Sequence, residues 1–174
     1  MLSSFSISSN RSKRFLNEAL EEFAICLKAN EWRGKEHDCV NLFAHQFLID
    51  KIEPSAAIEY ATQIGIECGV QQPKKFANKA ARKDLVIWKK PLQNSWSEDW
   101  EAVNTPIAVM EWKLYRTKFP KTIFDAHDED WISSYTEEHS DRFGYVVSVD
   151  LTSEHTKVYW KHSRKGLFSK IFCI

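Results

Sequence analysis

The segment that most constrains the fold is the run Pro106–Tyr115, which has the strongest strand pattern in the chain. In a strand, successive side chains point to opposite faces of the sheet. Glu111 and Lys113 therefore project together from one face, and the other face is apolar through Met110, Trp112 and Leu114. Two opposite charges in an apolar strand cost free energy unless they are paired or bind a ligand. The segment predicts a buried sheet with a charged site on one face.

The length and composition are those of one globular domain. The chain has 174 residues, 43% of them hydrophobic and 28% charged, which fits a single domain over residues 1–174 with a sizeable core. Apolar residues at helical spacing predict an N-terminal helix over 11–29, which Ser12 is placed to cap. We expect the core over about 35–160, and we expect the apolar tail 166–174 to pack against it.

The remaining elements are grouped by type along the chain. Helices are expected over 35–51 and 128–139, with a shorter helix that opens at Pro54. The other expected strands cover residues 66–70, 85–88, 144–151 and 156–160. An order of helices, strands, one helix and more strands indicates an α/β fold, a small mixed sheet flanked by helices.

Two acidic residues lie on neighbouring predicted strands. Asp84 directly precedes the apolar run Leu85–Trp88 and stands 27 residues before Glu111. If the two strands are adjacent, the carboxylates converge and can share one cation. Asp84, the apolar run and Glu111-x-Lys113 together resemble the signature of the PD-(D/E)XK nuclease superfamily, whose fold is called restriction-endonuclease-like.

The resemblance covers about residues 35–160. Glu36, in the first turn of the second predicted helix, matches an additional acidic residue that many members carry there. The helix that begins near Asp128 and the strand 144–151 match the helix and strand that usually follow the lysine. The chain departs from the family pattern before Asp84, where the family's proline is missing.

The resemblance implies hydrolysis of DNA phosphodiester bonds with Mg²⁺ or Mn²⁺ as cofactor. Asp84 and Glu111, with Glu36 as an auxiliary acid and the backbone carbonyl of Trp112, offer the hard oxygen ligands that these ions prefer. The ion would activate a water molecule and neutralise charge on the phosphate. Lys113 would be the catalytic lysine, which orients the water and stabilises the transition state.

Several other interpretations of these residues stay open. Glu111 and Lys113 also suit a structural charge pair at a sheet edge, and Glu36 suits a helix N-terminal acid. The alternative function is an inactive nuclease-like scaffold that serves as a binding or interaction module, and RNA or a nucleotide is a further possible substrate. In Asp125-x-His127-Asp128, either aspartate is expected to cap the following helix rather than bind metal.

The expected partner is DNA. A basic stretch adjoins Asp84 and suits either phosphate contact or a solvated loop; it comprises Lys74, Lys75, Lys79, Arg82 and Lys83. A second basic group is a weaker candidate, with Lys157, Lys161, Arg164 and Lys165. The formal net charge of zero argues against strong non-specific coating of DNA. Trp96 and Trp100 are expected to pack more than to stack on bases.

The chain has no sequence signal for a membrane or for secretion. Its four cysteines form no CxxC pair, and this favours a reducing, cytoplasmic location. The N-terminal residues lack the apolar run of a signal peptide, and no apolar stretch has membrane-spanning length. The apolar tail offers a contact surface for a homodimer or a partner protein through Leu167, Phe168, Ile171 and Phe172.

Overall fold

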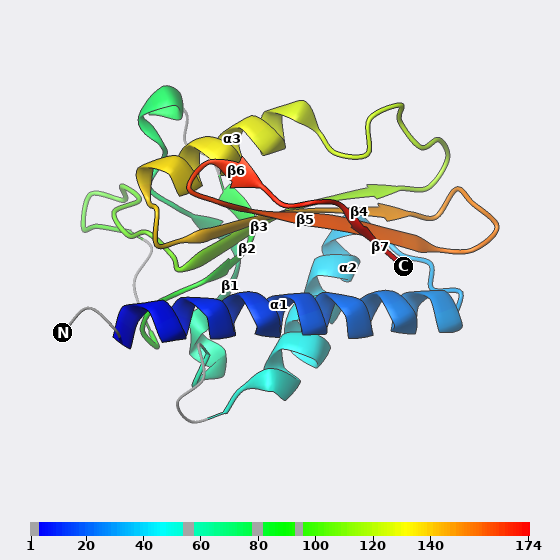
Figure 1. Cartoon of the computed structure of the whole chain (residues 1–174), viewed down its shortest axis with the longest axis horizontal. Coiled ribbons are helices and arrows are strands. Elements are labelled where there is room, and N and C mark those ends of the chain that lie inside the picture. The colour runs from blue at the N-terminus through cyan, green and yellow to red at the C-terminus, as the bar shows by residue number, and fades with distance from the viewer. Residues whose placement is uncertain (1–3, 54–57, 78–81, 93–95) are drawn as a thin grey trace.

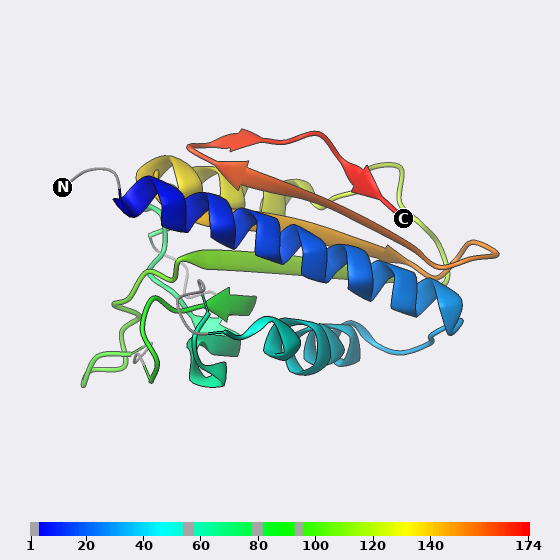
Figure 2. The ribbon, with the colours of Figure 1, turned by 60° about the horizontal axis from the view of Figure 1, so that its bottom comes forward.

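The protein has a mixed α/β architecture in which one sheet lies between two helical layers. The computed structural model describes residues 4–53, 58–77, 82–92 and 96–174, with side chains from Arg14 onward. The long helix α1 (Ser4–Ala29) and α2 (Glu36–Leu42) cover one face of the sheet. The opposite face carries α3 (Ala126–Glu138), as Figures 1 and 2 show. The predicted α/β class with a flanked mixed sheet is confirmed.

The sheet follows the strand order β1-β2-β3-β4-β5-β6, and β7 also pairs with β5. The bounds of these strands are Ile64–Gly69 (β1), Arg82–Ile87 (β2), Ala108–Tyr115 (β3), Phe143–Asp150 (β4), Lys157–Arg164 (β5), Leu167–Phe168 (β6) and Phe172–Cys173 (β7). Only β3 and β4 among these pairs are parallel, and α3 makes the crossover between them. The sheet is therefore mixed, with β3 at its centre.

Helices form the N-terminal third of the chain. The first helix was expected from residue 11, but α1 begins at Ser4, so Ser12 lies inside the helix and does not cap it. The sequence before residue 11 holds no Gly or Pro to stop a helix, and extending an existing helix avoids the cost of nucleation. The helix expected over 35–51 is present, as α2 continued by a π-helix over Phe43–Leu48 and a 3-10 turn over Ile49–Lys51.

Two short helical turns lie on either side of β1. Residues 54–57, where Pro54 was expected to open a helix, lie outside the described residues. A 3-10 turn covers Ala61–Gln63 just before β1, and another covers Lys74–Phe76 between β1 and β2. Neither turn extends into a regular helix within the described ranges.

The alternation predicted for the central strand is present. Met110 and Trp112 join the core under α1 and α2, where the Trp112 ring lies 5.5 Å from Phe23 and 5.2 Å from Phe43. Val109, two residues before Glu111, belongs to the second core under α3. The two hydrophobic cores thus fix which face of β3 carries Glu111 and Lys113: the face under α3.

Helix α3 approaches this face closely because of one glycine. A Cβ atom on Gly144 of β4 would lie 2.5 Å from Cγ2 of Ile132, so only glycine permits this spacing without a shift. Trp131, Ile132 and Tyr135 of α3 are buried against the sheet. The first turn of α3 is thereby held above β3.

The C-terminal tail packs on the sheet, as expected. β6 and β7 pair with β5, and the Phe172 ring stacks on Trp160 at 5.4 Å. Leu167 and Ile171 remain exposed, by 76% and 46%. No described helix is long and apolar enough to cross a bilayer.

Candidate functional site

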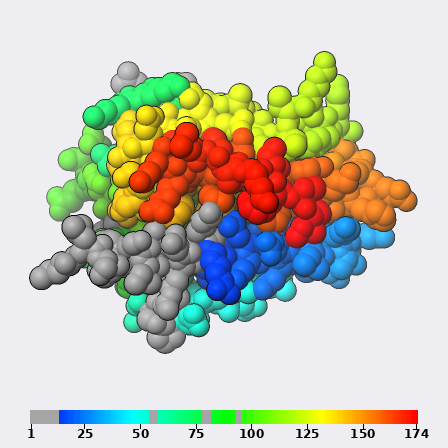
Figure 3. Space-filling view, viewed as in Figure 1, coloured from blue at the N-terminus to red at the C-terminus, as the bar shows by residue number. Residues whose placement is uncertain are grey.

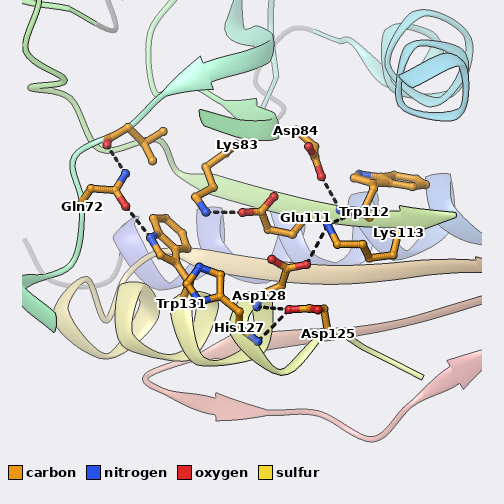
Figure 4. Close-up of polar contacts among 11 residues, drawn as sticks. Gln72, Lys83, Asp84, Glu111, Trp112, Lys113, Asp125, His127, Asp128 and Trp131 are labelled. Carbon is orange, nitrogen blue, oxygen red and sulfur yellow. Dashed lines mark hydrogen bonds and ion pairs between the residues drawn. The ribbon is translucent and has the colours of Figure 1, made fainter. Parts of the chain in front are cut away.

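The site begins where β2 separates from β3. The two strands pair through Ile87–Ala108, Val86–Val109 and Leu85–Met110, and the ladder ends there. One residue further, Oδ2 of Asp84 accepts a hydrogen bond of 2.7 Å from the backbone N–H of Trp112 (Figure 4). A carboxylate therefore takes the place of a strand carbonyl. It anchors Asp84 to the peptide that links Glu111 to Trp112.

Glu36 performs the same role one step further along β3. It is the first residue of α2, and its Oε2 accepts a 3.0 Å hydrogen bond from the backbone N–H of Leu114. The edge of β3 that β2 leaves open is thus lined by two carboxylates. Burial raises the pKa of Glu36, and the carboxylates of Asp84 and Asp128 raise it further against the opposing charge of Lys113.

Glu111 is almost fully buried on the α3 face, with 7% of its surface exposed. Its Oε1 receives a short hydrogen bond from Nζ of Lys83. Burial raises the pKa of Glu111, since the charged form loses hydration, and the nearby Asp84 and Asp128 carboxylates act in the same direction. Lys83 opposes this rise but does not cancel it.

Lys83 is enclosed together with Glu111. Its ammonium lies 3.6 Å from the centre of the Trp131 ring, and the indole N–H of Trp131 donates a 2.7 Å hydrogen bond to Gln72. With 3% of its surface exposed, Lys83 is not presented to solvent as a phosphate-binding lysine would be. The phosphate contact predicted for Lys83 is therefore replaced by an internal ion pair.

Lys113 is more accessible, because 35% of its side chain is exposed. Its Nζ donates a 3.0 Å hydrogen bond to the carbonyl of Trp112 and lies 3.2 Å from Oδ2 of Asp128. Burial disfavours the charged form of Lys113, but the carboxylates of Asp128, Glu36 and Asp84 outweigh it and raise the pKa of Lys113. The ammonium is therefore held charged at the mouth of the site.

Asp128 is the functional candidate that the sequence did not identify. Asp125 caps α3, accepting hydrogen bonds from the backbone N–H groups of His127 (2.9 Å) and Asp128 (3.2 Å), which confirms the predicted cap. Asp128 lies in the first turn, on the same helical stripe as the buried Trp131 and Ile132. That spacing was the available signal that its side chain faces the sheet.

These residues form what we call the acidic cluster: Glu36, Asp84, Glu111 and Asp128. Two ammonium groups contact it, those of Lys83 and Lys113. Four carboxylates and two ammonium groups leave a formal charge of −2 when all are ionised. Burial also raises the pKa of Asp128, against the opposing charge of Lys113. When fully ionised, the cluster therefore holds more negative charge than the two ammonium groups balance.

The donors suit a hard divalent ion in chemistry and charge. Within residues 4–53, 58–77, 82–92 and 96–174, no three His, Cys, Asp or Glu side chains are grouped to hold a metal ion. Mg²⁺ normally takes only one or two carboxylates from a protein and completes its shell with water and substrate oxygens. Glu111 and the Trp112 carbonyl belong to neighbouring residues of β3, and Asp84 accepts a hydrogen bond from the peptide between them. Together they offer such a set.

The other residues of the predicted basic stretch have different environments. Lys75 is paired with Asp130 at 2.5 Å, and the backbone N–H of Lys74 donates to Glu138. Arg82 is exposed, and Lys79 lies outside the described residues. In the second basic group Lys161 is paired with Glu129, whereas Lys157 and Lys165 are exposed. Among the described members of the two groups, Lys75 and Lys161 are thus taken up by ion pairs with α3.

The two tryptophans of the polar loop differ. Trp96 forms a β-bridge with Ala102, and its ring lies against Gly69, where an added Cβ would be 2.4 Å from it. Trp100 is 78% exposed. Packing, expected for both, is observed for Trp96 alone.

No protein-family model, curated protein or solved structure matches the chain.

Proposed function

We propose that the chain is a metal-dependent nuclease of the restriction-endonuclease-like kind that hydrolyses DNA phosphodiester bonds at the acidic cluster. The observation that carries the proposal is a partly buried set of four carboxylates that, once ionised, carries two negative charges in excess, next to the partly exposed ammonium of Lys113. Buried charge of one sign is costly unless a counter-ion is supplied. A divalent cation has the charge that is missing.

The order of elements supports the same proposal. Glu36 begins a helix that precedes the strands, Asp84 lies on β2, and Glu111 and Lys113 lie on the adjacent β3. A helix and a parallel strand, α3 and β4, then follow. This is the arrangement that the PD-(D/E)XK resemblance implies.

Asp84 and Glu111 would hold the metal through carboxylate oxygens, with the carbonyl of Trp112 between them and Glu36 as an auxiliary acid. A bound Mg²⁺ or Mn²⁺ would lower the pKa of a water molecule and neutralise charge on the phosphate. The hydrogen bond from the Trp112 N–H keeps the Asp84 carboxylate beside β3. Glu111 keeps its position through Lys83, because ligating carboxylates need a second partner to fix their orientation.

Lys113 would act on the substrate. Its ammonium is held between the Trp112 carbonyl and Asp128, and its partial exposure leaves a donor free for a phosphate oxygen or the attacking water. A fixed positive charge in a partly dry site stabilises the negative charge that develops on the phosphate. Asp128 would keep the ammonium in place.

Cleavage of supercoiled plasmid tests the proposal. We expect nicking with Mg²⁺ or Mn²⁺ and none with EDTA. Asp84→Asn and Lys113→Ala should abolish nicking, whereas Lys28→Ala, an exposed lysine on α1, should leave it unchanged. Cleavage that survives both site substitutions would reject this assignment.

A second candidate is a nuclease-like scaffold that binds without cutting. It is favoured by the way protein donors already occupy the cluster: Asp84 bonds to Trp112, Glu111 to Lys83, and Lys113 to Asp128. A structure-only role needs no further ligand for these groups. Nucleic-acid binding with no cleavage in either metal would select this function.

A further inference from the structure

Three aromatic rings form a row where β3 ends. The Tyr115 ring lies 5.1 Å from Phe119, and the Phe119 ring lies 5.6 Å from Tyr159 on β5. All three side chains are partly exposed. We call these residues the aromatic row. Half-exposed rings in contact with one another present faces and edges on which planar groups can stack.

The row adjoins the acidic cluster. Tyr115 follows Lys113 by two residues on the same strand, which places it on the same face about 7 Å further along. Tyr159 packs against the hydrophobic core under α3, so it lies on this face too. A ligand that contacts Lys113 can therefore extend directly over the row.

The loop that carries Phe119 is basic. Residues 116–121 include Arg116, Lys118 and Lys121, all exposed, and no acidic residue. Among the ion pairs of the described residues, none involves these three cations. The loop belongs to the yellow-green projection at the upper right of the molecule in Figure 3. Its charges are free to meet an anionic partner.

The basic loop and the stretch before Asp84 differ in this respect. In the earlier stretch, Lys75 is paired with Asp130 and Lys83 is buried against Glu111. The loop cations have no such partners. Apart from the exposed Arg82, the positive charge described as available near the site therefore lies past the end of β3, beside the aromatic row.

We infer that the aromatic row and the loop 116–121 bind single-stranded DNA next to the acidic cluster. Bases would stack on Tyr115, Phe119 and Tyr159, and phosphates would contact Arg116, Lys118 and Lys121. Proteins that bind single strands combine stacking rings with a positive surface in this way. The position of the strand beside a cleavage site rests on the proposed function, but the binding itself does not.

Duplex DNA suits this surface less well. Its bases are stacked on one another, so their faces cannot contact protein rings, and proteins commonly reach its base edges by placing a helix in the major groove. The helix nearest the row is α3, which carries Asp128, Glu129 and Asp130 in its first turns. An acidic helix end repels the phosphates that border the groove.

Fluorescence anisotropy of a labelled single-stranded oligonucleotide tests the inference, with the full chain in EDTA so that nothing is cleaved. We expect binding at least tenfold tighter than to the duplex of the same sequence. Phe119→Leu should weaken binding about tenfold, because it keeps an apolar group but removes a stacking ring, while Phe119→Tyr should retain it. Equal affinity for both DNA forms, or no effect of Phe119→Leu, would overturn the inference.

The loop charges have a separate readout. Replacing Arg116, Lys118 and Lys121 together by Ala should reduce the slope of log affinity against log salt by about 2, since each neutralised phosphate of a single strand contributes about 0.7. The matched control replaces one arginine and two lysines exposed elsewhere, Arg14, Lys28 and Lys170, and should leave the slope unchanged. An unchanged slope in the loop variant would also overturn the inference.

The two proposals fail in different ways. Single-strand binding in EDTA that depends on Phe119, without cleavage in any metal, would reject the nuclease and retain the aromatic row. Metal-dependent cleavage that needs Lys113, together with single-strand binding that does not change when Phe119 or the loop cations are replaced, would retain the nuclease and reject the aromatic row.

Discussion

Two lysine–carboxylate pairs face α3 and differ in nearly every physical respect. Lys83 and Glu111 form a short hydrogen bond in the interior, with side-chain exposures of 4% and 7%. Lys113 and Asp128 lie 3.2 Å apart at the rim, with exposures of 35% and 13%. The first pair is closed by the Trp131 ring, whereas the second is reached by solvent mainly through Lys113. On the proposed function, the first lysine would serve the structure and the second would serve the substrate.

The difference follows from desolvation. Removing one member of a buried pair leaves an uncompensated charge in a medium of low dielectric constant, and this costs several kcal/mol. Removing one member of an exposed pair costs little, because water solvates the remaining group. Replacing Lys83 should therefore mainly lower stability, whereas replacing Lys113 should mainly lower activity.

Lys83→Met should have the largest effect on stability. Met keeps much of the side-chain volume beside Trp131 but leaves Glu111 buried without a partner, so we expect a loss of about 3–5 kcal/mol in the free energy of unfolding at pH 8 in EDTA. Urea denaturation measures it. The double variant Lys83→Met with Glu111→Leu should recover most of the loss. A single-variant loss below about 1 kcal/mol would mean that the pair is not buried as described.

Lys113→Ala should have the largest effect on activity. We expect the rate of DNA cleavage to fall about 100-fold or more, because a positive charge that stabilises the transition state is removed. The free energy of unfolding should fall by less than in Lys83→Met, because solvent reaches this pair at the rim and does not reach the Lys83–Glu111 pair. Single-turnover cleavage and urea denaturation measure the two quantities. A stability loss as large as that of Lys83→Met would erase the distinction between the pairs.

The metal-free protein should lose stability as pH rises. Burial raises the folded-state pKa of Glu36, Glu111 and Asp128 above their ordinary values of 4.5, 4.5 and 3.8. As pH rises past those ordinary values, the folded state retains protons that the unfolded state has released, so the free energy of unfolding decreases until the folded groups ionise. Urea melts from pH 4.5 to 8 measure the slope. Glu111→Gln should flatten the dependence of the free energy of unfolding on pH. An identical slope in that variant would contradict the raised pKa assigned to Glu111.

Glu36→Gln should have the smallest effect. The amide oxygen can still accept the hydrogen bond from Leu114, so the stability change should stay within about 0.5 kcal/mol. The lost charge acts on Lys113 and would also act on a bound metal ion, so Mn²⁺ affinity should fall a few-fold. Calorimetric titration measures this, and an affinity equal to that of the wild type would remove Glu36 from the site.

The sequence predicted the part of this site that depends on local periodicity. The alternation of β3 placed Glu111 and Lys113 on one face, and helical periodicity placed Glu36 in the first turn of α2. The partners of the two lysines could not be predicted in this way. Asp128 reaches Lys113 only because Gly144 lets α3 lie close to the sheet. That packing is a tertiary effect.

The role of Lys83 depends on a local departure from strand alternation. Leu85 and Ile87 face the core under α1 and α2, so regular alternation would place Lys83 there too. Instead its ammonium reaches Glu111 and Trp131 on the opposite face. The departure occurs where β2 leaves β3 and where Glu67, opposite Asp84, has a φ of 52°. Sequence periodicity carries no signal of such a break.

Mn²⁺ binding measured by electron paramagnetic resonance at pH 8 tests the central claim, that the acidic cluster needs a divalent cation. We predict that the wild type binds Mn²⁺, that Mg²⁺ competes for the same site, and that Asp84→Asn and Glu111→Gln each abolish or greatly weaken binding while Lys28→Ala has no effect. A wild type that binds no Mn²⁺, or binding that persists unchanged in both carboxylate variants, would contradict it.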